Sequence, residues 1–416
     1  MSQRIYGSRI VKVVKQRCQP HLSFFGNKLI TIILFQPPKG LENPQMSAQY
    51  SAAVTSTNQK VSTFRFLGCD VERKELDAEI SSSQFAKVLK DAASNPNSIG
   101  IIVQNPIPQH KLRSRLELIP PSLDIDGINP NSIFQASATS EAISRLVSEF
   151  AEAGDRVAVV GSRGFVGSGV VRLLQSRNIK TIELDRATGN TDAQIKESVL
   201  SADLVVSATG KANLIQSDHL KTSHKLVVDA GFIPQADGTV LGDIGKNAYD
   251  IPEYLTPVPG GVGPTQMAVL LERIMSVAQV SIQPWNYHRD VLEPLKAEKA
   301  AKISYSYSDY AASVADEGLA GAKKIAKNAL RAGIEPKQVT EMLLTLPPLQ
   351  RQLNGGFLLH RLPTRSNSVS CKTPVASSPQ AISVLTGCPT ALRPRCSSTK
   401  QLAKSLGISA PQYWHL

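Results

Sequence analysis

The sequence is poor in the residues that stabilise secreted proteins and membrane proteins. It has five cysteines in 416 residues, and no two of them stand at the spacing of a metal site or a redox motif. No apolar run approaches the ~20 residues that a membrane helix needs. The histidines are scattered and match no metal-binding pattern. These absences predict a reduced, cytoplasmic protein with no metal centre and no membrane partner.

Acidic residues are scarce at both ends of the chain. The first acid is Glu42, and the basic stretch before it favours an amphipathic first helix over an organelle transit peptide, which can have the same composition. Residues 351–416 hold eight Lys or Arg residues and no acid. This tail supplies +8 of the net charge of +12 and leaves +4 for the first 350 residues. The charge that would suggest an anionic partner therefore belongs mainly to the tail.

Residues 1–140 alternate between predicted helices and predicted strands. Ligands of parallel sheets with crossover helices sit beyond the carboxyl ends of the strands. Gln104, directly after a strand, and Tyr50, on a helix that follows a strand, are therefore candidate ligand contacts. The predicted strands are 28–35, 62–67 and 99–103, and the predicted helices are 8–19, 46–57 and 83–93.

A proline-rich turn at residues 120–127 carries two carboxylates, Asp124 and Asp126. Two interpretations are open for them. Aspartates in turns commonly bind their own backbone, and from these residues alone we favour that role over catalysis. A helix predicted at 139–153 then leads into the next part of the chain.

The stretch 156–186 has the layout of a dinucleotide site. An apolar strand is followed by Gly161, Gly164 and Gly167, then by an apolar helix and a second strand that ends at Asp185. Glycines let the backbone approach a pyrophosphate, and the free N–H groups of the helix start can bind it. The spacing is GxxGxxG rather than GxGxxG, so a plain glycine-rich turn is the alternative. The order of strand, turn, helix, strand and acid favours the cofactor site.

Asp185 favours NAD over NADP. A carboxylate at this position binds both ribose hydroxyls and repels a 2′-phosphate, although Arg186 beside it would attract one. Two further strands, at 203–210 and 225–231, should end on the cofactor side. The predicted cofactor contacts are Gly161, Ser162, Arg163, Gly164, Gly167, Asp185, Arg186, Thr209 and Gly210.

Five segments follow one another in a recognisable order. They are residues 103–108, 120–127, 161–167, 203–210 and 256–264, and the last reads TPVPGGVGP. Together they resemble the methylenetetrahydrofolate dehydrogenase/cyclohydrolase family over about residues 1–282, and the last segment matches the family signature at every position. The resemblance implies two α/β domains with a folate cleft between them, the second a Rossmann-like domain that binds NAD(P).

The resemblance also implies a reaction and its residues. The family oxidises 5,10-methylenetetrahydrofolate to the 5,10-methenyl form by hydride transfer to NAD(P), and bifunctional members then hydrolyse the product to 10-formyltetrahydrofolate. By this likeness Tyr50 would stack on the folate, Gln104 would support the site, and Asp126 would bind the pterin ring. The residues implied to line the cleft are Pro259, Gly260 and Gly261.

One departure from the family changes the expected chemistry. The family has a lysine four residues after its tyrosine, and counting from Tyr50 places Val54 there. Lys60 follows six residues later, which rotates it by about 240° around a helix. We therefore predict that Lys60 cannot replace the missing ammonium and that cyclohydrolase activity is lost, because valine transfers no proton. Further departures are Leu123 and the order Ser162-Arg163.

The predicted organisation has four parts. Residues 1–140 form a folate-binding domain and residues 141–282 form the Rossmann-like domain, whose helix 265–280 packs back on the first domain. Residues 283–350 form a helical extension with helices at 308–315, 318–332 and 337–346, for which a small bundle is favoured over a DNA-binding motif. Residues 351–416 form a basic, disordered tail, for which nucleic-acid contact has weak support. The family suggests a homodimer.

Three functions compete at this point. The first is an NAD-dependent methylenetetrahydrofolate dehydrogenase, with a tetrahydrofolate derivative as its substrate and NADP as the less favoured cofactor. The second is a degenerate homologue that binds nucleotide, folate or a macromolecule without turnover, which Val54 and the foreign C-terminal third support. The third is another NAD-dependent oxidoreductase with a substrate other than folate.

Overall fold

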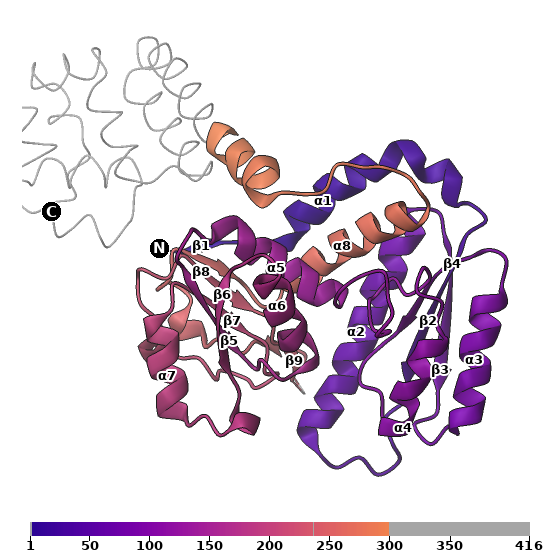
Figure 1. The fold of residues 1–416 in the computed structure, drawn as a ribbon, viewed down its shortest axis with the longest axis horizontal. Coiled ribbons are helices and arrows are strands. Elements are labelled where there is room, and N and C mark those ends of the chain that lie inside the picture. The colour runs from indigo at the N-terminus through magenta and orange to yellow at the C-terminus, as the bar shows by residue number, and fades with distance from the viewer. Residues whose placement is uncertain (1, 236, 299–416) are drawn as a thin grey trace, which may run out of the picture. The chain divides into compact units, whose positions relative to one another are not determined.

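The computed structural model describes residues 2–235 and 237–298. The helices predicted at 308–315, 318–332 and 337–346, and the tail at 351–416, lie outside the described residues. Residues Met1–Leu292 form one compact unit (Figure 1), which contains all of the elements discussed below.

The first domain is built on a three-stranded parallel sheet in the order β3-β2-β4. The central strand β2 (Leu29–Phe35) pairs in parallel with β3 (Asp70–Leu76) and with β4 (Ser98–Val103). The strands β2 and β4 are apolar and buried, whereas β3 is polar at the edge. The helices of this domain are α2 (Pro44–Phe66), α3 (Ser82–Ser94) and the short α4 (His110–Arg113).

The strand predicted at 62–67 is wrong, because these residues form the last turns of α2. The helix begins after Asn43, whose side chain accepts hydrogen bonds from the first backbone N–H groups, and it continues to Phe66. Valine, threonine and phenylalanine near its end have strand propensity, but packing overrides propensity. The buried residues recur every three or four positions along its whole length: Tyr50, Ala53, Thr57, Lys60, Thr63 and Phe64.

The second domain is a six-stranded parallel sheet in the order β1-β11-β8-β7-β5-β6. Helix α7 (Asp192–Ser201) packs its apolar side on one face of this sheet. Helices α5 (Ala138–Phe150) and α6 (Phe165–Gln175) lie against each other, so closely that a Cβ on Gly169 would come within 2.5 Å of Ser140 Oγ. The strands are β1 (Gln3–Arg4), β5 (Arg156–Val160), β6 (Lys180–Leu184), β7 (Leu204–Ser207), β8 (Leu226–Asp229) and β11 (Tyr254–Thr256).

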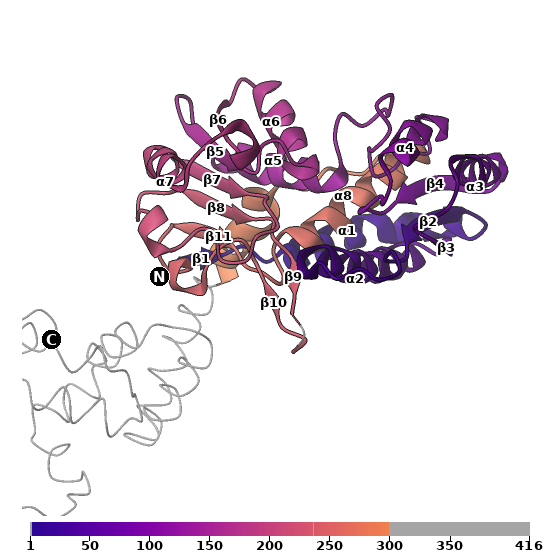
Figure 2. The ribbon, with the colours of Figure 1, turned by 90° about the horizontal axis from the view of Figure 1, so that it is seen from below.

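Two helices connect the domains. Helix α1 (Gly7–Cys18) follows β1 and packs along α8 (Val262–Val277), as both ribbon views show (Figures 1 and 2). The contact is tight at the start of α1, where a Cβ on Gly7 would lie 2.4 Å from the carbonyl oxygen of Gly261. The first strand of the chain therefore belongs to the sheet of the second domain, although the sequence placed residues 1–140 together.

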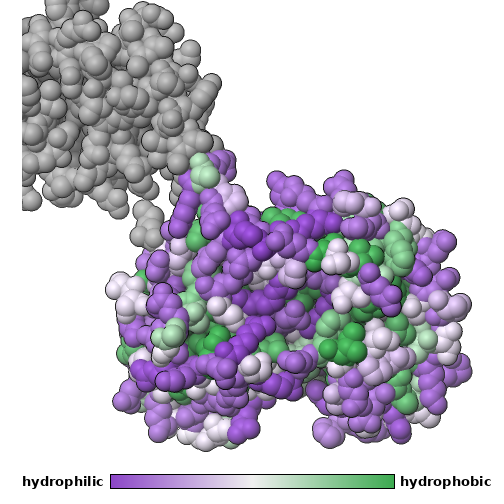
Figure 3. Space-filling view, turned by 45° about the horizontal axis from the view of Figure 1, so that its top comes forward, coloured by the Kyte–Doolittle hydropathy of each residue, from purple (hydrophilic) through white to green (hydrophobic). Residues whose placement is uncertain are grey.

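A short hairpin of β9 (Ile233–Pro234) and β10 (Val240–Leu241) projects from the second domain (Figure 2). On the face shown in Figure 3, hydrophilic residues dominate and hydrophobic residues form small, separate patches. Within the described residues, no helix is both long enough and apolar enough to cross a membrane. Apart from the correction in α2, the helices and strands predicted for residues 1–282 are confirmed to within three residues at each end.

Candidate active site

Three polar side chains from separate segments of the first domain meet at one point. The Nζ atom of Lys60, on α2, donates to Gln104 Oε1 at 2.7 Å and to Asp126 Oδ2 at 3.0 Å. Lys60 is 1% exposed and Asp126 is 7% exposed. A buried ammonium that is hydrogen-bonded to a buried carboxylate costs desolvation energy, and such arrangements cluster at functional sites.

The placement of Lys60 corrects the expectation that it lies away from the site. The rotation of 240° was counted from Val54, but Val54 is 39% exposed and faces away from the domain core. Because α2 runs on through residue 60 without a break, Lys60 falls on the buried stripe of the helix. If Lys60 is taken as the family lysine, the family tyrosine is expected four residues before it, and this chain has Ser56 at that position.

Gln104 and Asp126 are held by the backbone around them. Gln104 directly follows β4, and its backbone N–H donates to Ile33 O at 2.7 Å, which ties it to the end of β2. The turn that carries Asp126 is fixed by Asp124, whose carboxylate accepts from Gly127 N at 3.1 Å and from Asn129 N at 2.7 Å. Asp124 thus has the turn-forming role favoured from the sequence, and Asp126 is the member of the pair that faces Lys60.

The electrostatic balance at Asp126 favours the carboxylate. Burial opposes its ionisation, but the nearby Lys60 ammonium, its hydrogen bond and the charge of Arg273 together lower the pKa of Asp126 below its ordinary value. Burial raises the pKa of the neighbouring Asp124. Asp126 Oδ1 is buried and has no hydrogen-bond partner among the described residues. This oxygen is an acceptor that a bound ligand could use.

Tyr50 lies in the core of the first domain and not beside Lys60. Its side chain is 4% exposed and packs in a cluster with Phe35 and Phe85. Ten residues separate it from Lys60, which is about 15 Å along the axis of α2. Its role as the residue that stacks on folate stays a prediction, and the distance from Lys60 speaks against it.

The glycine-rich loop 256–264 leads from the second domain into the start of α8, which lies beside α2. Gly260 has φ +110°, a conformation that favours glycine, and Gly261 N donates to Pro257 O at 2.8 Å. A Cβ on Gly263 would lie 3.6 Å from the side chain of Gln59, the neighbour of Lys60. The predicted cleft residues Pro259, Gly260 and Gly261 therefore come just before the part of α8 that approaches α2, and their role in the cleft stays a prediction.

The glycine turn of the second domain has the geometry of a phosphate-binding turn. Gly161 follows β5 with φ +86°, and a Cβ on Gly167 would lie 2.1 Å from Gly161 O. Gly164 caps the start of α6 without any side chain. Ser162 Oγ is buried without a partner among the described residues. The close approach of backbone to backbone and the open helix start fit a dinucleotide pyrophosphate.

Asp185 and Arg186 take different positions at the end of β6. Asp185 Oδ2 accepts from Arg163 N at 3.1 Å and Oδ1 accepts from Ala187 N at 2.8 Å, so the carboxylate also holds the glycine turn. Arg186 forms an ion pair with Asp192. The structure thus keeps an acid next to the glycine turn, as predicted, and pairs the neighbouring arginine with another carboxylate.

Thr209 and Gly210 follow β7 and are held by buried acids. Asp243 Oδ2 accepts from Thr209 N at 2.6 Å and from Thr209 Oγ1 at 2.9 Å, and Asp229 Oδ1 accepts from Asp243 N at 2.9 Å. Burial, followed by repulsion from Asp243, raises the pKa of Asp229 to about 7. The hydroxyl of Thr209 is hydrogen-bonded to Asp243, and its role as a cofactor contact stays a prediction.

Comparison with known proteins identifies the family to which this chain belongs. The sequence profile described as the NAD(P)-binding domain of tetrahydrofolate dehydrogenase/cyclohydrolase matches residues 137–282. The bifunctional protein FolD of Brevibacillus brevis is 31% identical over 225 residues, which cover 51% of this chain and 78% of that protein. The chain belongs to the tetrahydrofolate dehydrogenase/cyclohydrolase family. FolD 2 of Acinetobacter baylyi is likewise 31% identical, over 243 residues that cover 56% of this chain and 84% of that protein.

The fold is also that of solved family members. The methylenetetrahydrofolate dehydrogenase-cyclohydrolase of Trypanosoma brucei, solved with NADP and an inhibitor, superposes with a TM-score of 0.57 at 22% identity and covers 67% of this chain and 97% of that one. The predicted family and the predicted pair of α/β domains are thus confirmed. As a member of this family, the chain is an oxidoreductase of one-carbon folate metabolism with a nicotinamide cofactor.

Two residues of this site were not predicted from the sequence: Lys60 was considered and rejected, and Arg273 was not considered. Lys60 was excluded because the family lysine was counted from Tyr50, which placed it at Val54. The spacing of three and seven residues that separates Lys60 from Thr57 and Ala53 is helical and could have indicated the buried stripe. Arg273 drew no attention, because nothing near it in the sequence indicates that it reaches the Asp126 turn.

Proposed function

We propose that the protein oxidises 5,10-methylenetetrahydrofolate to 5,10-methenyltetrahydrofolate, with a nicotinamide cofactor as the hydride acceptor. The observation that carries this proposal is the cluster of Lys60, Gln104 and Asp126, which lies in the domain preceding the dinucleotide turn. The free Oδ1 of Asp126 accepts a hydrogen bond from the pterin ring, and the loop at Gly260 and Gly261 lines the same site. These groups orient the substrate, and orientation is the main requirement of a hydride transfer.

We further propose that Lys60 serves the hydrolytic step. The prediction that this step is lost rested on an ammonium missing from the site, and the position of Lys60 removes that reason. Water that adds to the methenyl carbon must lose a proton, and the ring nitrogen that departs must gain one. An amine held between Gln104 and Asp126 can give and take protons at this place, with one proton released overall.

The preferred cofactor in this proposal is NAD. The carboxylate of Asp185 beside the glycine turn would repel a 2′-phosphate. Arg186, the residue that would attract that phosphate, is paired with Asp192. Both observations support NAD, and NADP is the second choice.

The first experiment mixes the full-length protein with methylenetetrahydrofolate and either NAD or NADP. The methenyl-folate and NADH absorbance bands should rise together, and kcat/KM should be higher with NAD. Equal kcat/KM with NADP would refute the cofactor preference. No absorbance change with either cofactor would refute the dehydrogenase.

The second experiment supplies methenyltetrahydrofolate alone and follows the loss of its absorbance. Hydrolysis should exceed the rate in buffer, and the Lys60→Met variant should not. If the unmodified protein hydrolyses methenyltetrahydrofolate no faster than buffer does, the proposed role of Lys60 in hydrolysis is refuted and the prediction of a dehydrogenase without cyclohydrolase activity stands.

A degenerate homologue that binds folate without turnover is the alternative. The observation that favours it is Ser56, four residues before Lys60, where the family tyrosine would supply an aromatic ring. Calorimetric binding of methylenetetrahydrofolate, with no change in absorbance after NAD is added, would support this alternative. The homodimer and the cytoplasmic location stay proposals, and sedimentation would test the first.

A further inference from the structure

Arg273 lies on α8 and reaches the turn that carries Asp126. It is 3% exposed. Its Nη1 donates to Ile125 O at 3.0 Å, and its Nη2 donates to Ala136 O at 2.7 Å. Ile125 immediately precedes Asp126, and a Cβ on Gly127, which follows Asp126, would lie 2.2 Å from Ala136 O. The guanidinium therefore holds the backbone on both sides of the catalytic turn.

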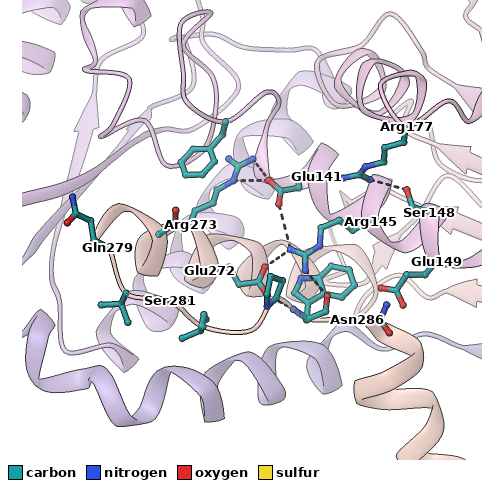
Figure 4. A pocket seen from close by; sticks show the side chains of 16 residues that line it. Glu141, Arg145, Ser148, Glu149, Arg177, Glu272, Arg273, Gln279, Ser281 and Asn286 are labelled. Atoms are coloured by element: carbon teal, nitrogen blue, oxygen red, sulfur yellow. Dashed lines mark hydrogen bonds and ion pairs between the residues drawn. The ribbon is translucent and has the colours of Figure 1, made fainter.

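The guanidinium is itself fixed in orientation. Glu141 Oε2, on α5, accepts from Arg273 Nε at 3.1 Å and from Nη2 at 2.7 Å, and the ring of Phe134 stacks on it at 4.3 Å. Figure 4 shows Glu141 between the guanidinium groups of Arg273 and Arg145, beside a groove of about 800 Å³ between α5, α8 and the segment after α8. A planar guanidinium with partners on its edge and an aromatic ring on its face has one orientation.

The charge of Arg273 also acts on the site. Burial is the largest effect on the pKa of Asp126 and raises it. The Lys60 ammonium lowers this pKa, and the charge of Arg273 lowers it further. The hydrogen bonds of Arg273 go to Glu141 and to the backbone at Ile125 and Ala136, so its effect on the Asp126 carboxyl group is through space.

We propose that Arg273 is a positioning residue, which holds the Asp126 turn from the last helix of the second domain in the geometry that Lys60 needs. This inference rests on the proposed function of the Lys60 site. Because α8 begins at the loop with Gly261, the helix joins two parts of that site: the glycine loop at its start and the Asp126 turn near its end. A lysine at position 273 would keep the charge but lose the fork that spans Ile125 O and Ala136 O.

Arg145 offers a matched control on the same groove. It is a partly buried arginine on α5 that pairs with Glu272 and, at 3.6 Å, with Glu141 Oε1. It also donates to Trp285 O at 2.7 Å and stacks on the Trp285 ring at 4.0 Å. None of these partners belongs to the Asp126 turn. Arg145→Met therefore removes the same group and a similar amount of packing as Arg273→Met. It leaves in place the hydrogen bonds of Arg273 to Glu141 Oε2 and to the backbone at Ile125 and Ala136.

The experiment compares Arg273→Met, Arg273→Lys and Arg145→Met in the full chain, in both reactions and as a function of pH. Arg273→Met should lower kcat/KM by about 10- to 100-fold, the order expected for a small misplacement of a catalytic group. The acid limb of its pH profile should move to higher pH, because Asp126 loses a nearby positive charge. Arg273→Lys should also lower kcat/KM, but its acid limb should move less than that of Arg273→Met. Arg145→Met should leave both kcat/KM and the position of the acid limb unchanged. The inference would be overturned if Arg273→Met and Arg145→Met had the same kcat/KM and the same pH profile.

A stability measurement separates this inference from the proposed reaction. The decrease in melting temperature of the Arg273→Met/Lys60→Met double variant should differ from the sum of the decreases in the two single variants, because both side chains hold the same turn. The corresponding cycle with Arg145→Met should add. Absence of turnover in the unmodified protein would refute the proposed function alone, whereas additivity in the Arg273 cycle would refute the positioning role. If Arg273→Met does not fold, the same cycle with Arg273→Lys decides.

Discussion

Replacing Lys60 by methionine tests the centre of the proposed site. Methionine is unbranched and of similar length, so it fills the space along α2 while removing the ammonium. The change leaves the buried carboxylate of Asp126 without its nearest positive charge. Breaking a buried ion pair from one side costs about 3–5 kcal/mol, and we expect about 3 kcal/mol here, because Arg273 still stabilises the carboxylate.

The loss should depend on pH in a defined direction. The pKa of Asp126 is lowered in the folded protein, so its interaction stabilises the fold above the unfolded pKa and is lost as the pH falls through the folded value. The difference in unfolding free energy between the unmodified protein and Lys60→Met should therefore be largest at neutral pH and shrink below about pH 4. Urea denaturation at several pH values measures it.

The loss of activity should exceed what the lower stability explains. Removal of a proton-transfer group lowers a rate by about 10²- to 10⁴-fold, and hydrolysis should fall by this order under conditions where the variant is folded. Lys60→Arg is the sharper variant, because a guanidinium can pair with Asp126 but does not release its proton. We expect it to retain more stability than Lys60→Met and still lose hydrolysis.

Val54→Lys is the control on the exposed face of the same helix. The sequence alone placed the missing lysine of the hydrolytic step at this position, whereas the structure places Val54 on the solvent side of α2. Its rate should therefore equal that of the unmodified protein, with a change in stability of less than about 0.5 kcal/mol. Hydrolysis that survives in Lys60→Met, or rises in Val54→Lys, would refute the assignment of Lys60.

Three further predictions concern the second domain. Asp185→Ser should raise the NADP to NAD ratio of kcat/KM by about tenfold, since it removes a negative charge from the position expected for the 2′-phosphate; an unchanged ratio would contradict that placement. Because the pKa of Asp229 is raised to about 7, its contribution to stability should fall by about 1 kcal/mol between pH 6 and pH 8, and Asp229→Asn should remove this slope in urea titrations. Gly167→Ala should cost about 1–3 kcal/mol, because its Cβ would lie 2.1 Å from Gly161 O, whereas Gly26→Ala, with no neighbour within 4 Å, should cost nothing.

Much of the second domain could be predicted from the sequence because its signals are local. The apolar strand β5, the glycines after it and the acid at the end of β6 follow one another within about thirty residues, and each has a backbone reason to be where it is. The same holds for the Asp124 turn, whose backbone contacts lie within five residues of the aspartate. Local signals of this kind do not need knowledge of the rest of the fold.

The first domain was harder because the end of α2 carries conflicting signals. Between Thr57 and Phe66 the chain has strand-forming side chains, yet its buried positions recur at helical spacing. Ending the helix early moved the expected strand to the wrong segment. Taking Tyr50 as the family tyrosine removed Lys60 from the expected site. Arg273 was beyond reach for another reason, since its partner Ile125 lies 148 residues away in the sequence.

Neighbouring carboxylates in this protein have different roles that only the tertiary structure separates. Asp124 and Asp126 stand two residues apart, yet one accepts backbone N–H groups while the other meets an ammonium and keeps an oxygen free. The partners of Asp124 come from its own turn, so its role is structural in any fold that forms this turn. The positive charges that act on the Asp126 carboxylate come from α2 and α8, so its role exists only when both helices are in place. A residue whose partners are distant in sequence is therefore the one whose chemistry depends on the assembled domains, and Arg273 is the contact through which α8 takes part.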